Sequence, residues 1–175
     1  MSDDRVITDF GEWTDYRIPG DRSDWHPLVR QFYEYWLSIT PEGRLPGRQH
    51  IAPEHMVPML SRMWMLDVHR DPLRFRYRLY GTALANSLHR EVTGRWMDEA
   101  APEIVSNPEI RDRLCFLAEA GRPTWRRGPT LRAGREPLHR LIENCVVPLA
   151  ADGRTVDIIV GVAVLFDATG REIPA

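Results

Sequence analysis

Six histidines are the first residues in this sequence that suggest a metal site or acid–base chemistry. Paired ligands on a zinc-binding helix lie at i and i+4, whereas His50 and His55 are five residues apart and flank Pro53. The remaining histidines fall on separate stretches, at His26, His69, His89 and His139. The sequence also has no Cys-x-x-Cys pair. We therefore expect no metal site.

Serine and cysteine give no better sign of a reaction centre. A nucleophilic side chain needs an adjacent base, and the sequence lacks the Gly-x-Ser-x-Gly turn that exposes a reactive serine. Cys115 falls within a predicted helix and Cys145 within a predicted strand, where a thiol is usually a small core side chain. We expect no catalytic residue and a protein that is not an enzyme.

Composition narrows the class of protein further. Hydrophobic residues make up 43% and charged residues 27%, as in ordinary globular proteins, and the net charge of −2 gives no reason to expect a nucleic-acid partner. The first residues lack the apolar segment of a signal peptide, and the longest apolar run is too short for a membrane helix. We therefore expect a cytoplasmic protein with neither a nucleic-acid nor a membrane partner. Reduced cysteines fit that compartment, although the sequence alone leaves a disulfide open.

Every one of the 23 basic residues is an arginine. Arg74, Arg76 and Arg78 alternate with apolar residues, which predicts a strand that is half buried and half exposed. A second group lies at Arg126, Arg127, Arg132 and Arg135. Guanidinium groups suit anionic ligands or acidic partners, but a solvated face is the interpretation that the scattered pattern favours.

The last fifty residues give the clearest signal for secondary structure. Two apolar runs, 139–150 and 155–166, enclose Asp152-Gly153, a dipeptide typical of a hairpin with a type I′ turn. The second run is apolar at both odd and even positions, so both of its faces must be covered. We expect it in the middle of a sheet.

A strongly amphipathic helix is predicted near the start of the chain, after a cap at Ser23 or Asp24. Its apolar residues recur at helical spacing, and they are Leu28, Val29, Phe32, Tyr33, Tyr35, Trp36 and Ile39. So much aromatic surface must be buried, either on the chain's own sheet, which is the commoner case, or against a second protomer. In the second case Leu28, Phe32 and Trp36 are the candidates for a dimer interface.

Strands and helices alternate in the middle of the chain. A longer helix is predicted over 107–120, because Asn107 can cap it, Pro108 suits its first turn and Gly121 can end it. The other predicted elements are strands at 63–69, 74–80 and 125–131 and short helices near 53–60 and 82–88.

This order, with helices between the second and third of five strands, is the arrangement of the PAS fold. The chain also resembles, over residues 25–166, a family of mostly single-domain bacterial PAS proteins. The matching segments are 45–51 (LPGRQHI), 71–82 (DPLRFRYRLYGT), 93–98 (TGRWMD) and 147–157 (VPLAADGRTVD). The resemblance implies an α+β fold with a five-stranded antiparallel sheet, its last strand in the middle beside the first. The inserted helices would cover one face and the N-terminal amphipathic helix the other.

The resemblance and the predicted elements divide the chain into four parts. We expect an irregular N-terminal arm at 1–22, the amphipathic helix at 23–41, the PAS core at 42–167 and a short polar tail at 168–175.

PAS proteins can bind flavin or haem, and the sequence argues against both. Light-sensing flavin members carry Asn-Cys-Arg-Phe-Leu-Gln, and residues 114–117 (LCFL) lack its asparagine, arginine and glutamine. A haem needs an axial histidine, and helix 107–120 has none. His89 is the one histidine in the insert, and a helix-end role is its simpler interpretation. We expect no cofactor.

The resemblance implies a stand-alone, non-catalytic sensory or interaction module that signals through a homodimer or a regulatory protein partner. An apolar pocket between helix 107–120 and the sheet would hold a small molecule, and its lining candidates are Phe75, Tyr77, Trp96, Leu114 and Leu117. Ordinary core packing is the alternative for these side chains. A competing function is a small α+β cone-fold enzyme of the isomerase or hydratase type, which needs helices ahead of the sheet and an acid–base pocket.

Overall fold

The computed structural model describes residues 18–130 and 141–175. Most of the expected N-terminal arm, as well as Arg132, Arg135 and His139, lies outside these described residues. Helices and short 3₁₀ turns come before β1 and again between β2 and β3. In order, the elements are α1 (Pro27–Ser38), η1 (Arg48–His50), α2 (Pro53–Met56), η2 (Val57–Arg62), β1 (Met63–His69), β2 (Arg74–Tyr80), α3 (Thr82–Leu88), α4 (Met97–Ala100), α5 (Pro102–Val105), α6 (Pro108–Ala120), β3 (Thr124–Pro129), β4 (Leu141–Leu149) and β5 (Ile158–Phe166).

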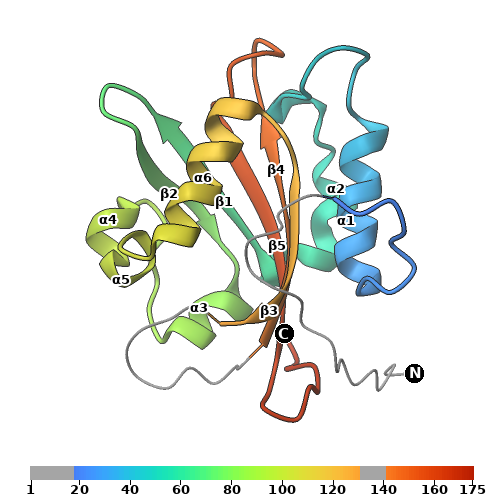
Figure 1. The fold of residues 1–175 in the computed structure, drawn as a ribbon, viewed down its shortest axis with the longest axis vertical. Helices are drawn as coiled ribbons and strands as arrows, with labels where there is room; N and C mark the ends of the chain where they lie inside the picture. The colour runs from blue at the N-terminus through green and yellow to red at the C-terminus, as the bar shows by residue number, and fades with distance from the viewer. Residues whose placement is uncertain (1–17, 131–140) are drawn as a thin grey trace.

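The five strands form one antiparallel sheet in the order β2-β1-β5-β4-β3 (Figure 1). The last strand therefore lies in the middle, hydrogen-bonded to β1 on one side and to β4 on the other. All nine residues of β5 are buried. This arrangement confirms the predicted fold class and the central position of the carboxy-terminal strand.

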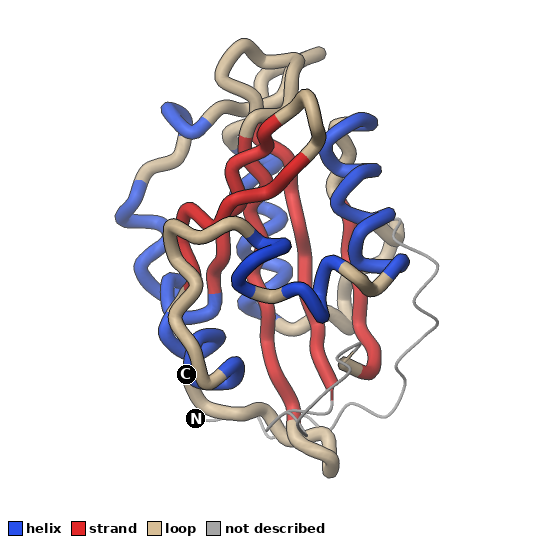
Figure 2. The backbone as a smooth tube through the Cα atoms, turned by 90° about the vertical axis from the view of Figure 1, so that its left-hand side faces the viewer, coloured by secondary structure: helices blue, strands red, loops and turns tan. Residues whose placement is uncertain are grey.

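Different helices cover the two faces of the sheet. α1 lies over one face and α6 over the other (Figure 1), and Figure 2 looks onto the face that carries α6. Side chains of β5 alternate between the two: Val160 and Val162 pack with the aromatic residues of α1, whereas Ile159 packs with the aliphatic residues of α6. The sheet is thus the middle layer of three, and the central strand contributes to the core on both sides.

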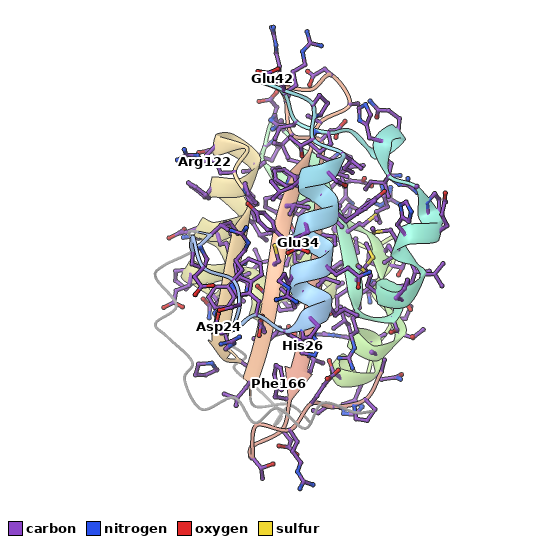
Figure 3. The ribbon with its side chains drawn as sticks, turned by 90° about the vertical axis from the view of Figure 1, so that its right-hand side faces the viewer. Asp24, His26, Glu34, Glu42, Arg122 and Phe166 are labelled. Carbon is purple, nitrogen blue, oxygen red and sulfur yellow. The ribbon has the colours of Figure 1, made fainter. Side chains whose placement is uncertain are left out.

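α1 lies over the sheet (Figure 3), and its aromatic stripe is buried against that sheet. Phe32 and Trp36 are only 3% and 6% exposed, and the indole Nε1 of Trp36 donates to the carbonyl of Pro148 at 3.1 Å. Leu28 packs at the margin of the same cluster. The burial of Phe32 and Trp36 in one chain therefore favours packing on the chain's own sheet over the alternative, a dimer interface at Leu28, Phe32 and Trp36.

The cap of α1 also differs from the prediction. The residue before the helix is His26, whose ring Nδ1 accepts the backbone N–H of Leu28 at 3.2 Å. Pro27 occupies the first turn, where a missing N–H costs nothing. Ser23 and Asp24 lie upstream of this cap. The carboxylate of Asp24 instead accepts a hydrogen bond from the guanidinium of Arg127.

The connection between β4 and β5 is longer than the predicted two-residue turn. The strands stop at Leu149 and resume at Ile158, and only Gly153 of the predicted pair has a positive φ, at +78°. A type I′ turn needs positive φ at both central residues. The carboxylate of Asp152 instead accepts the N–H groups of Arg154 and Thr155, which folds the loop around its own side chain.

The last residues fold back onto the body. The N–H of Ile173 donates to the carbonyl of Leu165 at 2.8 Å, and Arg62 of η2 binds the carboxylate of Glu172 at 2.7 Å. The segment 168–175, expected as a polar tail, is therefore attached to the end of β5 and to η2, directly ahead of β1. Within the described residues, no helix combines the length and the apolar character that crossing a bilayer requires.

Candidate ligand cavity

A cavity of about 160 Å³ lies between α6 and the sheet. Side chains from β1, β2, β4 and β5 form its floor, and residues of α3, α4, α5 and α6 close it from above. Its wall is mainly aliphatic and aromatic, with Trp64, Tyr77 and Tyr80 as the rings. The volume resembles that of an engineered cavity of about 150 Å³ that binds benzene. One small ring therefore fits this space.

The sequence of α6 places one face of the helix on the cavity. The side-chain Oδ1 of Asn107 accepts the N–H of Glu109 at 3.0 Å, and Pro108 follows it in the first turn. Gly121 ends the helix with a φ of +60°. Four residues at helical spacing face the cavity, namely Ile110, Arg113, Leu114 and Leu117.

The floor of the cavity depends on a glycine in the central strand. Gly161 of β5 lies opposite Trp64 of β1. A Cβ atom at position 161 would lie 2.2 Å from Cε2 of the indole, far inside van der Waals contact. The ring of Trp64 can lie across β5 only because position 161 carries no side chain.

The structure brings together three of the five predicted lining residues. Tyr77, Leu114 and Leu117 line the cavity. Phe75 belongs to the same apolar cluster but does not line the cavity, because it lies opposite Val68 near the β1–β2 turn. Trp96 lies outside as well: its ring packs under the guanidinium of Arg74 at 4.3 Å and against His69 at 4.8 Å.

Arg113 is the feature of the cavity that the sequence analysis missed. It is 5% exposed, and it lies on the apolar face of α6. Its Nε donates to Oγ1 of Thr124 at 2.8 Å, and its Nη1 donates to Oδ1 of Asn144 at 2.7 Å. The sequence did hold a signal for this residue: an arginine interrupts the i, i+3, i+4, i+7 apolar stripe of the predicted helix. A charge on a buried helix face must have polar partners, so such a position indicates a buried polar site.

Thr130 adds a second polar group to the wall. Its hydroxyl is buried and has no hydrogen-bond partner among the described residues. Such hydroxyls are rare in proteins, because a buried polar group loses its hydration without compensation. The cavity is therefore apolar over most of its wall but carries polar side chains, among them Ser87, Arg113, Thr130 and Asn144.

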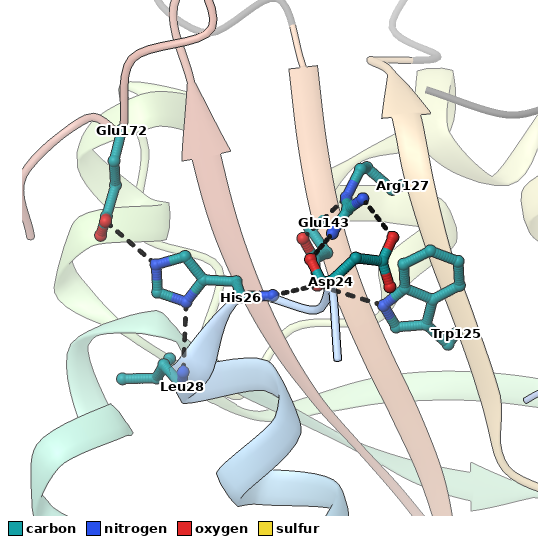
Figure 4. Close-up of polar contacts among 7 residues, drawn as sticks. All are labelled: Asp24, His26, Leu28, Trp125, Arg127, Glu143 and Glu172. Carbon is teal, nitrogen blue, oxygen red and sulfur yellow. Dashed lines mark hydrogen bonds and ion pairs between the residues drawn. The ribbon is translucent and has the colours of Figure 1, made fainter. Parts of the chain in front are cut away.

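A second polar cluster lies on the opposite face of the sheet, at the start of α1 (Figure 4). We call it the clasp; it consists of Asp24, His26, Arg62, Trp125, Arg127, Glu143 and Glu172. Glu143 is fully buried and accepts the backbone N–H of His26 at 2.8 Å, Nε of Arg127 at 2.9 Å and Nε1 of Trp125 at 3.2 Å. The clasp therefore attaches the first residues of α1 to strand β4.

The clasp continues from His26 to the carboxy-terminal segment. Because Nδ1 of His26 accepts the N–H of Leu28, Nε2 carries the ring proton and donates to Oε2 of Glu172 at 3.0 Å. That hydrogen bond, aided by the charge of Arg62, holds the pKa of Glu172 below its ordinary value against the opposing effect of burial. The clasp thus joins the entry of α1, η2, β3, β4 and the carboxy-terminal segment.

The two groups of arginines differ in exposure: Arg76 and Arg78 of β2 are exposed, as the interpretation of a solvated face predicts. Arg126 and Arg127 are buried at 1% and 9% exposure, so the prediction of a solvated face is wrong for them. On β2, Arg74 forms a bidentate pair with Asp98, and Arg78 pairs with Asp67 at 2.6 Å. Arg74 thus attaches α4 to the sheet, and Arg78 joins β2 to β1.

The other candidate groups for chemistry lie apart. Across residues 18–130 and 141–175, no group of three or more histidine, cysteine or carboxylate side chains is arranged to hold a metal ion. His50 caps a turn by accepting the N–H of Gly47, and His89 ends α3 with a left-handed backbone. Cys115 and Cys145 are free thiols, and burial raises the pKa of Cys145.

Comparison with known proteins agrees with this geometry. A family model described as a PAS domain matches residues 25–124, more than half of the chain, from the entry to α1 to the start of β3. No curated protein matches the chain. With its sheet order, its helices inserted between β2 and β3 and this match, the chain belongs to the PAS domain family.

Proposed function

We propose that this chain is a non-catalytic sensory module that holds a small molecule in the cavity under α6 and signals through contacts with another protein. PAS domains are in general sensory or interaction modules. The observation that carries the proposal is the cavity itself, about 160 Å³ between α6 and the sheet. Protein interiors contain few voids larger than a water molecule, so a space of this size favours a ligand over ordinary core packing.

Two adjacent residues of β4 offer a route from the cavity to the other face of the sheet. Asn144 lines the cavity and accepts a hydrogen bond from Arg113, whereas Glu143 belongs to the clasp at the start of α1. Successive side chains of a strand point to opposite faces. A ligand that shifts β4 would therefore also shift the entry of α1 and, through His26 and Glu172, the carboxy-terminal segment.

The partner in this proposal is a second copy of the chain or a regulatory protein. Its contact surface lies elsewhere than at Phe32 and Trp36, because both side chains are buried in the chain's own core. Native mass spectrometry of the purified protein reports both oligomeric state and any retained small molecule. We expect a mass above that of the chain, either from a retained molecule or from a dimer.

The cavity is tested directly with toluene, a single-ring apolar probe. We expect toluene to shift the NMR signals of residues on α6 and β5, and Ala163→Leu to abolish the shifts because Ala163 lines the cavity. Leu37→Ala on the exposed side of α1 is the matched control and should leave the shifts intact. A protein that is empty and monomeric, and that takes up no toluene, would contradict the proposal.

The competing function, a cone-fold enzyme of the isomerase or hydratase type, has less support. Such an enzyme needs an acid or base in its pocket. Within the described part of the chain, the cavity wall contains no aspartate, glutamate or histidine. Turnover of a small ketone or acid by the purified protein would favour the enzyme instead.

A further inference from the structure

Thr130 gives the cavity a chemical preference. The residue follows the last position of β3 and lines the cavity. Thr130 as a whole is half-buried, but its hydroxyl oxygen is shielded from solvent and has no hydrogen-bond partner among the described residues. A buried hydroxyl in this state has lost its hydration without compensation. A ligand that supplied the missing hydrogen bond would remove that cost.

Other polar side chains of the wall already form hydrogen bonds within the protein. The hydroxyl of Ser87 donates to the carbonyl of Leu84 at 2.8 Å. The amide oxygen of Asn144 accepts Nη1 of Arg113 at 2.7 Å. Ser87 and Asn144 are therefore weaker candidates than Thr130 for a hydrogen bond to a ligand.

The register of the sheet places Thr130 at one end of the cavity. Pro129, directly before it, pairs with Leu141 of β4. The next residue of β4, Ile142, lies opposite Leu165 of β5, and both of these side chains line the cavity. Thr130 is therefore a polar residue at an end of the cavity where the floor is aliphatic.

The neighbouring wall favours a ring as the body of the ligand. Trp64 and Tyr80 pack against a small aliphatic cluster, which consists of Leu84, Ala163 and Leu165. All five of these residues line the cavity. Aromatic side chains pack favourably with another ring in offset or edge-on geometry. About 160 Å³ accommodates one such ring and little more.

We propose that the ligand is a phenol, a single aromatic ring with one hydroxyl, which forms a hydrogen bond with Thr130 while its ring lies against Trp64 and Tyr80. This inference rests on the proposed function, because it names the class of molecule for the same cavity. A phenol has a pKa of about 10 and is therefore neutral at pH 7. Its hydroxyl can donate and accept, as can that of Thr130, so the hydrogen bond forms with either group as the donor.

The test compares phenol with toluene on the full chain by NMR titration. The two probes have nearly the same shape, since a methyl group of toluene takes the place of the hydroxyl. In a wholly apolar cavity phenol would bind more weakly than toluene, because its hydroxyl would lose its hydrogen bonds to water. A site with an unpaired polar group instead disfavours the analogue that cannot bond to it. We therefore expect phenol to bind at least as tightly as toluene.

Thr130→Val assigns this preference to the hydroxyl, because valine has nearly the shape of threonine. We expect the affinity for phenol to fall about tenfold, since a buried hydroxyl left unpaired costs that much, and the affinity for toluene to stay the same or rise. The variant should be at least as stable as the parent, because the hydroxyl that it removes makes no hydrogen bond among the described residues. Thr155→Val, at an exposed threonine of the β4–β5 loop, is the matched control and should change neither affinity.

The outcomes separate this inference from the proposed function. Failure of both probes to bind would overturn both. Binding of toluene together with weaker binding of phenol would overturn the phenol assignment and leave the sensory cavity standing. Tight binding of phenol that survives Thr130→Val would show that another group holds the hydroxyl, and would also overturn the assignment to Thr130. The comparison of the two probes needs no variant, so a substitution that fails to fold does not block the test.

Discussion

Glu143 and Asn144 are sequence neighbours on β4 whose side chains serve opposite faces of the sheet. The carboxylate of Glu143 accepts the backbone N–H of His26 at the start of α1, and the amide oxygen of Asn144 accepts Nη1 of Arg113 in the cavity wall. One peptide bond therefore joins the clasp to the cavity. The predictions below test the parts of this arrangement separately.

The glycine under Trp64 is the first part. Gly161→Ala places a Cβ atom 2.2 Å from the indole, so the ring or the strand must move. We expect the free energy of unfolding to fall by about 1–3 kcal/mol, as in other overpacked cores, together with weaker binding of toluene. Urea denaturation measures the loss. Gly20→Ala, where nothing lies within 4 Å, is the control, and an equal effect at both positions would contradict the role of Gly161.

The aromatic stripe of α1 is the second part. Trp36→Ala removes a side chain that is 6% exposed and hydrogen-bonded to Pro148, so we expect a loss of about 3–5 kcal/mol in the free energy of unfolding. Leu37→Ala, at a 43% exposed position on the same helix, should change it by about 0.5 kcal/mol or less. If Trp36→Ala left the stability intact and only changed the mass in solution, the stripe would be an interface between chains after all.

The buried carboxylate of the clasp is the third part. Glu143→Gln removes the charge that Arg127 faces at 2.9 Å, with both side chains buried. Breaking such a pair from one side leaves the buried guanidinium of Arg127 with the exposed carboxylate of Asp24 as its remaining described counter-charge, so we expect a loss of about 3 kcal/mol in chemical denaturation. Glu34→Gln, in an exposed pair with Arg30 at 3.9 Å, should cost about 0.5 kcal/mol or less. Similar losses at the two positions would contradict a structural role for the clasp.

The pH dependence of stability tests the link between His26 and Glu172. The pKa of Glu172 is lower in the folded chain than in the unfolded chain, mainly because His26 donates to its carboxylate. A depressed pKa adds stability above the unfolded value, about 4.3 for glutamate, and this stability is lost as the pH falls through the folded value. We expect Glu172→Gln to lower the free energy of unfolding at pH 7 and to make less difference at about pH 3.

The same comparison has an internal control. Glu54→Gln changes an exposed glutamate on α2 and should leave the pH profile of stability close to that of the parent. Parallel profiles for the parent and Glu172→Gln between about pH 7 and pH 3 would mean that the carboxylate has the same pKa in both states.

Local patterns were enough to predict most of the fold. The doubly apolar run placed β5 at the centre of the sheet, and the Asn107, Pro108 and Gly121 signals marked α6 correctly. The β4–β5 turn was predicted wrongly, because the side chain of Asp152 folds the loop in a way that the Asp-Gly pair does not reveal. Local sequence patterns therefore predicted an element correctly where the residues of that one segment determine its structure.

The candidate site was predicted less well, because it depends on contacts between distant segments. Tyr77, Leu114 and Leu117 share the cavity as predicted from their faces, but Trp96 does not, since Arg74 draws its ring to the outer side of β2. The clasp joins residues more than one hundred positions apart, such as Asp24 and Arg127. No periodicity encodes such a pair, so only coordinates could find it.

The position of β5 limits how this domain can respond. Strands border both of its edges and helices cover both of its faces, so none of its nine residues is exposed. Its amides should be among the last to exchange with heavy water, and only through global opening. Under the proposed function, a ligand in the cavity would then act through a rigid displacement of the whole sheet, because the strand that separates the two cores cannot unfold by itself.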